Sequence, residues 1–371
     1  MRLIYLSPVP WSSFAQRPHK FVEWFHARWA GKVLWVDPYP TRFPESSDFK
    51  FGKFIGRNTA RLPRVESIPS WLTVLGPLSL PIEPLPGSGV FNRLFWSATL
   101  KEIQFFVSGG KCLIGIGKPS EFALQVLDQH PGVPSLYDAM DDFPAFYSGL
   151  SRISMARRER EIADRVTRIL VSSTALAARF DIHQIKLAVA LNACAIETLP
   201  LPRTIVKNFD KPVIGYIGTI GHWFDWPLVC RLAEENSSMC IRVIGPVHVS
   251  HSGALPRNIE LLPACDHANA IKLMQNFSIG LIPFKCIDLT ASVDPIKYYE
   301  YRALGLPVIS TAFGEMALRH RESGVFLTES FHDLASIVEA AIEFEYHIDD
   351  INKFRSENTW ELRFNSSDIF F

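Results

Sequence analysis

The chain has 371 residues and a mass of 41.9 kDa, a length that predicts about two domains. With 47% hydrophobic and 20% charged residues it can bury two ordinary cores. Its formal net charge is zero, but residues 1–200 hold 23 Lys and Arg against 17 Asp and Glu, and the remainder holds 15 against 21. A basic N-terminal half fits an anionic acceptor or lipid surface better than a nucleic acid, which needs a more concentrated patch. We therefore expect no nucleic-acid partner.

The cysteines indicate a reducing compartment. They are widely scattered and form no Cys-x-x-Cys pair: Cys112, Cys194, Cys230, Cys240, Cys265 and Cys286. The chain enters a strand at Leu3–Leu6 without a signal peptide, and no apolar run reaches the roughly 18 residues that span a bilayer. We expect a cytoplasmic protein, either soluble or peripheral at the inner face of the plasma membrane.

The N-terminal residues predict the first half of a Rossmann-like domain. Arg2–Ser7 reads as a strand, the helix that opens at Arg17 carries one apolar face, and Val33–Asp37 is the next strand. The chain lacks a Gly-x-Gly-x-x-Gly fingerprint. Its nearest match, Gly115–Ser120, lacks the third glycine and has Pro119 in the turn, so we expect no dinucleotide there.

The composition changes between Asp48 and Arg64. Basic and aromatic residues are mixed there: Lys50, Lys53, Arg57, Arg61 and Arg64 with Phe49, Phe51 and Phe54. Such a mixture can seat a loop on an anionic membrane. An ordinary solvated loop with a few buried phenylalanines fits equally well.

Strands and helices then alternate to the end of the first domain. Helices are predicted over Asn92–Ser108 and Met155–Arg168, with strands at Cys112–Gly117 and Ile169–Ser173. This alternation indicates a doubly wound parallel sheet in an N-terminal domain of residues 1–198.

A second α/β series fills residues 199–348. A Pro-rich linker leads to a strand at Val213–Gly218, and a helix begins near Asp225, with Asp225 as the N-cap and Pro227 in the first turn. The tail, residues 349–371, is helical by its pattern.

The most informative stretch is Phe277–Phe313, a strand, a polar loop, a helix and a second strand. Asp294 suits the N-cap of this helix, Pro295 its first position, and Gly305 its end. Such a unit places its helix start at the carboxyl edge of a parallel sheet, where open α/β folds bind ligands.

That helix start has the features of an anion site. Its free N–H groups favour phosphate, and Lys297 adds a positive charge in the first turn. Glu300, one turn on, can accept hydrogen bonds from sugar hydroxyls. An exposed intrahelical ion pair between the two residues is the alternative.

The run from Pro295 to Val308 resembles the nucleotide-sugar signature of bacterial GT-B glycosyltransferases. The likeness is to family 4 and its relatives in capsule and exopolysaccharide assembly, including the xanthan glucuronosyltransferase. It implies two Rossmann-like doubly wound α/β domains facing a cleft, with the C-terminal helix of residues 349–371 crossing back to the first domain. It also implies that Lys297 meets the donor diphosphate and Glu300 the ribose. Family 4 usually has a second glutamate eight residues earlier, where this chain has Ser292.

A glycine loop follows the first strand of the second domain. Gly215, Gly218 and Gly221 recur at every third position and are followed by His222. Alone, such loops are often only tight turns; in the resemblance, this loop faces the donor diphosphate. The family often has Arg or Lys there, and His222 stands here instead, so Lys297 is the main predicted cation.

Three carboxylates, Asp138, Asp141 and Asp142, end a strand of the first domain. An inverting transferase needs a base for the acceptor hydroxyl, and neighbouring acids raise each other's pKa. Asp141 or Asp142 is the predicted base, with Asp138 and Arg17 on the acceptor side. The structural alternative is that one of the three aspartates caps the next helix and another pairs with Arg152 or Arg157.

The sequence therefore predicts a hexosyltransferase that moves a sugar from a nucleotide-diphosphate donor to a glycan or lipid-linked acceptor in cell-surface polysaccharide assembly. The nucleotide sugar is a substrate, and we expect no cofactor and no metal. Two alternatives stay open. One is a nucleotide-sugar 2-epimerase of the same fold, and the other is a non-catalytic nucleotide- or glycan-binding subunit.

Overall fold

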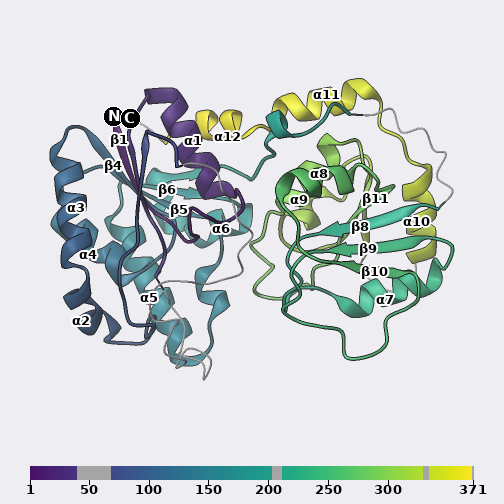
Figure 1. Ribbon diagram of the computed structural model, residues 1–371, viewed down its shortest axis with the longest axis horizontal. Coiled ribbons are helices and arrows are strands. Elements are labelled where there is room, and N and C mark those ends of the chain that lie inside the picture. Colours follow the sequence, from purple (N-terminus) through teal and green to yellow (C-terminus); the bar gives the residue numbers. More distant parts are fainter. Residues whose placement is uncertain (40–67, 203–210, 329–333, 370–371) are drawn as a thin grey trace. The chain divides into compact units, whose positions relative to one another are not determined.

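The computed structural model describes residues 1–39, 68–202, 211–328 and 334–369 (Figure 1). Contacts within the chain divide it into unit 1, Met1–Ala190 with Phe364–Phe371, and unit 2, Leu191–Arg363. Each unit is built on one parallel sheet. The basic and aromatic segment 48–64 lies outside the described residues.

Unit 1 has a seven-stranded sheet in the order β3-β2-β1-β4-β5-β6-β7. β1 lies near the centre, where Leu3 is beside Val33 on one neighbour and Leu113 on the other. The inner strands β1, β2 and β4 are apolar and buried because helices cover both faces of a parallel sheet, whereas the edge strands β3 and β7 are partly exposed. The strands are β1 Arg2–Leu6, β2 Val33–Val36, β3 Leu72–Leu75, β4 Cys112–Ile116, β5 Ser135–Ala139, β6 Arg168–Val171 and β7 Leu187–Val189.

The helices of unit 1 connect these strands and differ from the predicted ones in two places. The helix expected over Asn92–Ser108 is broken into α2, a 3₁₀ turn and α3. The helix expected over Met155–Arg168 begins earlier and ends at Arg165, because Arg168 already pairs with β5 in the sheet. The helical segments are α1 Arg17–Trp29, α2 Ser88–Asn92, η1 Arg93–Phe95, α3 Ser97–Ser108, α4 Glu121–Gln129, η2 Phe143–Phe146, α5 Gly149–Arg165, α6 Thr174–Arg179 and η3 Asp181–Lys186.

Unit 2 has a six-stranded parallel sheet in the order β10-β9-β8-β11-β12-β13. β8 and β11 are its central pair, and the chain order reverses between them. Ligands of open α/β sheets bind at such a point, outside the carboxyl ends of the strands. The strands are β8 Val213–Ile217, β9 Cys240–Ile244, β10 Ile259–Leu262, β11 Ile279–Ile282, β12 Val308–Thr311 and β13 Val325–Thr328.

The helices of unit 2 begin largely where capping residues predict. The side chain of Asp225 accepts a hydrogen bond from the backbone N–H of Leu228 (3.1 Å), and Pro227 lies in the first turn, as expected. The helical segments are η4 Ile196–Thr198, α7 Trp226–Glu235, α8 His267–Met274, α9 Ile296–Ala303, η5 Gly314–Arg319, α10 Leu334–Glu343 and α11 Ile348–Glu357.

The C-terminal segment returns to unit 1, as predicted. The tail forms two helices, α11 and α12 (Trp360–Ser366), and from Phe364 onward it belongs to unit 1. The Phe364 ring packs 5.2 Å from that of Phe21 and 5.3 Å from that of Trp24, both on α1. In the ranges that the structure describes, no helix is long and apolar enough to cross a membrane.

Candidate functional site

The first cluster of interest lies at the carboxyl edge of the unit 2 sheet. Gly218 follows β8 directly, and its N–H donates to the carbonyl of Ile244 at the end of β9 (2.8 Å). Its φ of +151° is in the region that glycine favours, and a Cβ there would lie 2.5 Å from Cε of Lys297. A side chain at this position would strain the backbone and displace the end of Lys297, so the glycine lets the lysine from α9 lie against this loop. The structure thus brings together Gly218 and Lys297, both predicted from the sequence.

The side chain of Lys297 is half-buried and its charge is poorly compensated. The Nζ atom lies 6.0 Å from the centroid of the Tyr216 ring, and among the described residues it makes no hydrogen bond. Burial lowers the pKa of this amine, and the nearby Glu300 carboxylate acts in the opposite direction. A desolvated ammonium beside the free N–H groups of a helix start is well suited to receive an anion.

Glu300 lies one turn along α9 from Lys297. Its Oε1 atom is 3.6 Å from Nε2 of His267, the first residue of α8. His267 was not singled out from the sequence, because it lies 33 positions before Glu300 and has no motif around it. The Glu300 side chain is 16% exposed, and its carboxylate can accept a hydrogen bond from a hydroxyl group.

The glycine loop is hydrogen-bonded to Lys285, which follows β11. The backbone N–H of Lys285 donates to the carbonyl of Trp223 (2.7 Å), and its Nζ donates to the carbonyl of His222 (3.2 Å). The His222 side chain is exposed, and Gly221 packs against the Trp223 ring. Lys285 is thus a second cation beside the loop, which the sequence did not indicate.

The start of α9 is held differently from the prediction. The helix begins at Ile296, with Pro295 as its N-cap residue, and Asp294 does not cap it. The buried Asp294 carboxylate instead accepts hydrogen bonds from the Asn192 backbone N–H (2.7 Å), the Tyr299 hydroxyl (2.8 Å) and the Arg319 guanidinium (2.8 Å). A buried carboxylate needs such partners, and Tyr299 on the same helix and two residues farther along the chain, Asn192 and Arg319, supply them. The expected N-cap role of Asp294 was therefore wrong.

A second cluster lies at the carboxyl edge of the unit 1 sheet, around β5. Asp138 is fully buried; one oxygen accepts from Nε of Arg17 (2.9 Å) and the other from the Tyr5 hydroxyl (2.9 Å). Arg17 is also buried and donates to the carbonyl of Ala190 (2.7 Å). Both residues predicted for the acceptor side thus lie inside unit 1 with each other as partners.

The Asp142 carboxylate is paired with an arginine. Arg179, on α6, donates through one nitrogen to Asp142 and through another to Glu159. Glu159 is buried, and desolvation raises its pKa to about 7, although Arg179 opposes that shift. The arginine lies 37 positions after Asp142 in the chain, and it is neither of the two arginines that local spacing suggested.

Asp141 is the carboxylate of this cluster with the most freedom. It is half-buried, and among the described residues no hydrogen bond to its side chain is found. Desolvation raises its pKa to about 7; Arg17 opposes the shift, and Asp138 and Asp142 add to it. A carboxylate with a pKa near neutrality that is not held by a partner can accept a proton at physiological pH.

No metal site accompanies either cluster in the part of the chain that the structure describes. No group of three or more His, Cys, Asp or Glu side chains there is placed to hold a metal ion.

Comparison with known proteins identifies the fold. No protein-family model matches the chain. Over 198 residues it is 24% identical to TuaH, assigned as a glycosyltransferase of teichuronic acid biosynthesis in Bacillus subtilis strain 168. That match covers 47% of this chain and 50% of TuaH, so it spans half the length of this relative.

Solved structures match over nearly the whole chain. Sucrose-phosphate synthase from Thermosynechococcus elongatus matches with a TM-score of 0.64 and 12% identity, over 99% of this chain and 97% of its own. HepE from Anabaena, solved with UDP and glucose, matches with a TM-score of 0.60 and 14% identity, over 100% and 96%. The glycosyltransferase AviGT4 of avilamycin A biosynthesis matches with a TM-score of 0.59 and 9% identity, over 99% of this chain and 97% of its own.

This chain has the GT-B fold. Its two parallel sheets of Rossmann type confirm the predicted fold class. The narrower likeness to family 4 and to the xanthan glucuronosyltransferase stays a prediction.

Proposed function

We propose that this protein is a glycosyltransferase that moves a hexose from a nucleotide-diphosphate donor to a glycan or lipid-linked acceptor in the assembly of cell-surface polysaccharide. The observation that carries the proposal is the ammonium group of Lys297, in the first turn of α9. It lies against Gly218, the residue after β8, and has no hydrogen-bond partner among the described residues. The sequence similarity to TuaH supports the reaction class and the polymer, and the likeness to HepE, solved with UDP and glucose, supports the donor.

In this proposal the donor diphosphate takes the place opposite Lys297. The phosphate oxygens accept hydrogen bonds from the ammonium and from the first N–H groups of α9. Glu300 accepts a hydrogen bond from a ribose hydroxyl, and Lys285 adds positive charge at the other side of the loop. Gly221, His222 and Pro295 shape the loop and the helix start around the phosphates.

The acceptor reacts at unit 1, with Asp141 as the residue that meets its hydroxyl group. In an inverting transfer Asp141 removes the hydroxyl proton, the acceptor oxygen bonds to the anomeric carbon, and the bond from that carbon to the diphosphate breaks. The nucleoside diphosphate leaves with the bonding electron pair, and Lys297 stabilises its charge. In a retaining transfer Asp141 only orients the acceptor hydroxyl. No cofactor and no metal takes part in this scheme.

Asp142, Asp138 and Arg17 support Asp141 in this proposal. Asp142 is engaged by Arg179, which favours Asp141 over Asp142 as the proton acceptor. Asp138 holds Arg17 in place, and the positive charge of Arg17 limits how far burial raises the Asp141 pKa. We propose that these residues position the reacting carboxylate and do not contact the acceptor.

Calorimetric titration of UDP, GDP, ADP and their sugar conjugates into the wild-type protein and Lys297→Ala tests the donor site. One nucleotide should bind the wild type and lose at least about tenfold in affinity in the variant, because a charge-assisted hydrogen bond is removed. Incubation of the bound nucleotide sugar with and without candidate acceptors then separates the functions. Sugar transfer supports the proposal, an epimerised nucleotide sugar supports an isomerase, and binding without either reaction supports a non-catalytic subunit.

A further inference from the structure

Three neighbouring strands of the unit 1 sheet, β2, β1 and β4, end level with one another. Leu6, the last residue of β1, lies beside Val36 of β2 and Ile116 of β4. β2 and β3 extend the sheet on one side of β1, and β4 to β7 extend it on the other, so the chain order reverses between β1 and β4. Because open α/β sheets bind ligands outside such a point, this edge of unit 1 can hold a ligand of its own.

A small hollow lies at these strand ends. Ser7 and Asp37, which follow β1 and β2 directly, line it together with Lys118, two residues after β4. Apolar side chains complete its wall: Leu6, Val36, Pro77 and Phe122. Its volume is about 20 Å³, which is room for one water-sized group. The hollow therefore admits a single small substituent of a ligand and not a whole sugar ring.

The Asp37 carboxylate is held through one of its oxygens. Its Oδ1 atom accepts hydrogen bonds from the Trp11 backbone N–H (2.8 Å) and from Nε1 of Trp35 (2.8 Å). No hydrogen bond from a described residue reaches Oδ2. Burial raises the pKa of this carboxyl group, and the two donors oppose the shift. The carboxylate is thus fixed in orientation and keeps one oxygen that can accept a hydrogen bond from a ligand.

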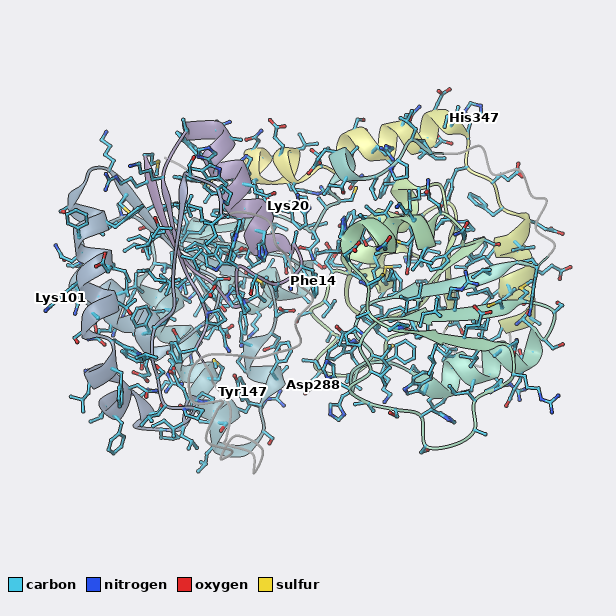
Figure 2. The ribbon with its side chains drawn as sticks, viewed as in Figure 1. Phe14, Lys20, Lys101, Tyr147, Asp288 and His347 are labelled. Atoms are coloured by element: carbon cyan, nitrogen blue, oxygen red, sulfur yellow. The ribbon has the colours of Figure 1, made fainter. Side chains whose placement is uncertain are left out.

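The loop after β1 holds Trp11 in place over Asp37. Nδ1 of His19 accepts from the Gln16 backbone N–H (3.2 Å), so Nε2 carries the proton and donates to the carbonyl of Trp11 (3.2 Å). Phe14, in the same loop, is 63% exposed and lies near the N-terminal end of α1 (Figure 2). Because the loop is already fixed at Trp11, orienting Asp37 adds little to the entropic cost of binding a ligand.

A hydroxyl group suits the polar residues of the hollow better than other small groups do. Burial lowers the pKa of Lys118 to about 8, against the effect of Glu83, so the amine is mostly charged at neutral pH. A hydroxyl can donate to the Asp37 carboxylate and accept from an ammonium group. A carboxylate on the ligand would be repelled by Asp37, and a methyl group would leave Oδ2 without a partner.

We propose that Asp37 is a specificity-determining residue for a glycan acceptor, and that the hollow takes a hydroxyl or hydroxymethyl group of one of its sugars. β1 and β4 lie between β2 and β5, and strands spaced about 4.8 Å apart put the ends of β2 and β5 roughly 14 Å from each other. That separation is longer than one sugar ring. The sugar at Asp37 is therefore not the one that reacts at Asp141, and the acceptor is an oligosaccharide. The word acceptor rests on the proposed function, whereas glycan binding at Asp37 does not.

Binding of the intact protein to an array of immobilised glycans, with and without UDP, tests this proposal. The wild type should bind a set of oligosaccharides and bind their single component sugars at least about tenfold more weakly. For a bound glycan, the form that lacks one hydroxyl, or carries a carboxylate in place of a hydroxymethyl, should bind more weakly at one sugar position. Asp37→Asn should weaken binding of the parent glycan about fivefold, because a charge-assisted hydrogen bond becomes a neutral one. It should also reduce the difference between that glycan and its deoxy form, which a purely structural role would leave unchanged.

Asp128→Asn is the matched control. Asp128 lies in the last turn of α4 in an exposed ion pair with Arg165 (2.6 Å), and the variant should bind glycans like the wild type. Val36→Ile adds a methyl group to the wall of the hollow and should weaken binding without any change of charge, which decides the matter if Asp37→Asn does not fold.

Three outcomes would overturn the proposal. The wild type may bind no glycan, it may bind single sugars as tightly as oligosaccharides, or Asp37→Asn may keep the full difference between the glycan and its deoxy form. Lys297→Ala should bind glycans normally. Glycan binding without sugar transfer to any bound glycan would overturn the proposed function and leave the site at Asp37 standing.

Discussion

At the scale of single residues, Lys297 is the side chain on which the donor site depends. Lys297→Ala should weaken binding of the nucleotide and of its sugar conjugate alike, by about 1.5–3 kcal/mol, because the contact is to phosphate. Burial lowers the pKa of this amine, so the charge is unfavourable in the empty site. The substitution should therefore not lower the melting temperature, which calorimetry of the ligand-free protein measures.

Lys272 provides the matched control for Lys297. It is an exposed lysine in the last turn of the neighbouring helix α8, and Lys272→Ala should leave nucleotide affinity unchanged. Equal losses in both variants would mean a general effect of charge. An unchanged affinity in Lys297→Ala would place the diphosphate elsewhere.

Asp141 and Asp142 are adjacent in the sequence and should respond differently to substitution. Asp141→Asn should lower turnover by about 10²–10⁴-fold if the residue is a general base, with donor affinity unchanged. Asp142→Asn removes an ion pair with Arg179 and should mainly lower stability, by about 0.2–1 kcal/mol. Steady-state kinetics and thermal unfolding of both variants measure the two effects. Full turnover in Asp141→Asn would favour a retaining mechanism or a base elsewhere.

The pKa of Asp141 also predicts a pH dependence of stability. The pKa of Asp141 is about 7 in the folded protein and 3.8 for an aspartate outside the fold, so folding disfavours the ionised carboxylate. The contribution of the protonated Asp141 to the free energy of unfolding is fully present below pH 3.8 and is lost as the pH rises through about 7. Asp141→Asn cannot ionise, so its melting temperature relative to wild type should rise between pH 5 and 8. A constant difference across that range would contradict the raised pKa.

At the scale of elements, α9 is held in place by the Asp294 network. Asp294 is fully buried, and Arg319 is its charged partner at 2.8 Å. Arg319→Met should lower the free energy of unfolding by about 3–5 kcal/mol, because it leaves a buried carboxylate without its counter-charge. It should also weaken donor binding, since Lys297 and Glu300 are carried by this helix. Urea unfolding and nucleotide titration measure the two results.

The double variant Arg319→Met/Asp294→Asn is the control for this network. Without the buried charge, much of the lost stability should return, and the difference from the single variants gives the coupling between the two residues. If Arg319→Met alone unfolds no more readily than the wild type, the ion pair does not hold α9.

At the scale of the whole molecule, the C-terminal residues of the chain belong to unit 1, although unit 2 precedes them in the sequence. Phe364 is buried against Phe21 and Trp24, and the Arg17 guanidinium lies 5.6 Å from its ring centroid. Phe364→Ala should destabilise unit 1 by about 3–5 kcal/mol, through lost contacts and the cavity left behind. In calorimetry the unit 1 transition should move to lower temperature, while nucleotide still stabilises unit 2.

Leu362, two residues earlier on α12, is the control for Phe364. It is 44% exposed, and Leu362→Ala should change stability by no more than about 0.5 kcal/mol. A loss as large as that of Phe364→Ala would indicate that the helix itself matters more than its aromatic contact.

The sequence by itself determined the fold class and the positions of Lys297 and Glu300 at one helix start. Apolar runs bounded by Pro and Gly give buried parallel strands, and the helices between them follow from periodicity and capping residues such as Asp225. These signals are local: the residues that make each element lie within one stretch of chain. The function and the roles of the site residues remain proposals.

Only the tertiary structure decided which polar groups have partners. Arg179 bonds Asp142 from 37 positions away, and the side chain of Asp141 has no hydrogen bond among the described residues. Asn192 and Arg319 donate hydrogen bonds to the Asp294 carboxylate. In the same way, apolar residues recur along α2, η1 and α3, and only packing shows that Leu100 and Ile103 are buried whereas Phe91 faces water. Pairing and exposure are set by residues far apart in the chain, and no local pattern encodes them.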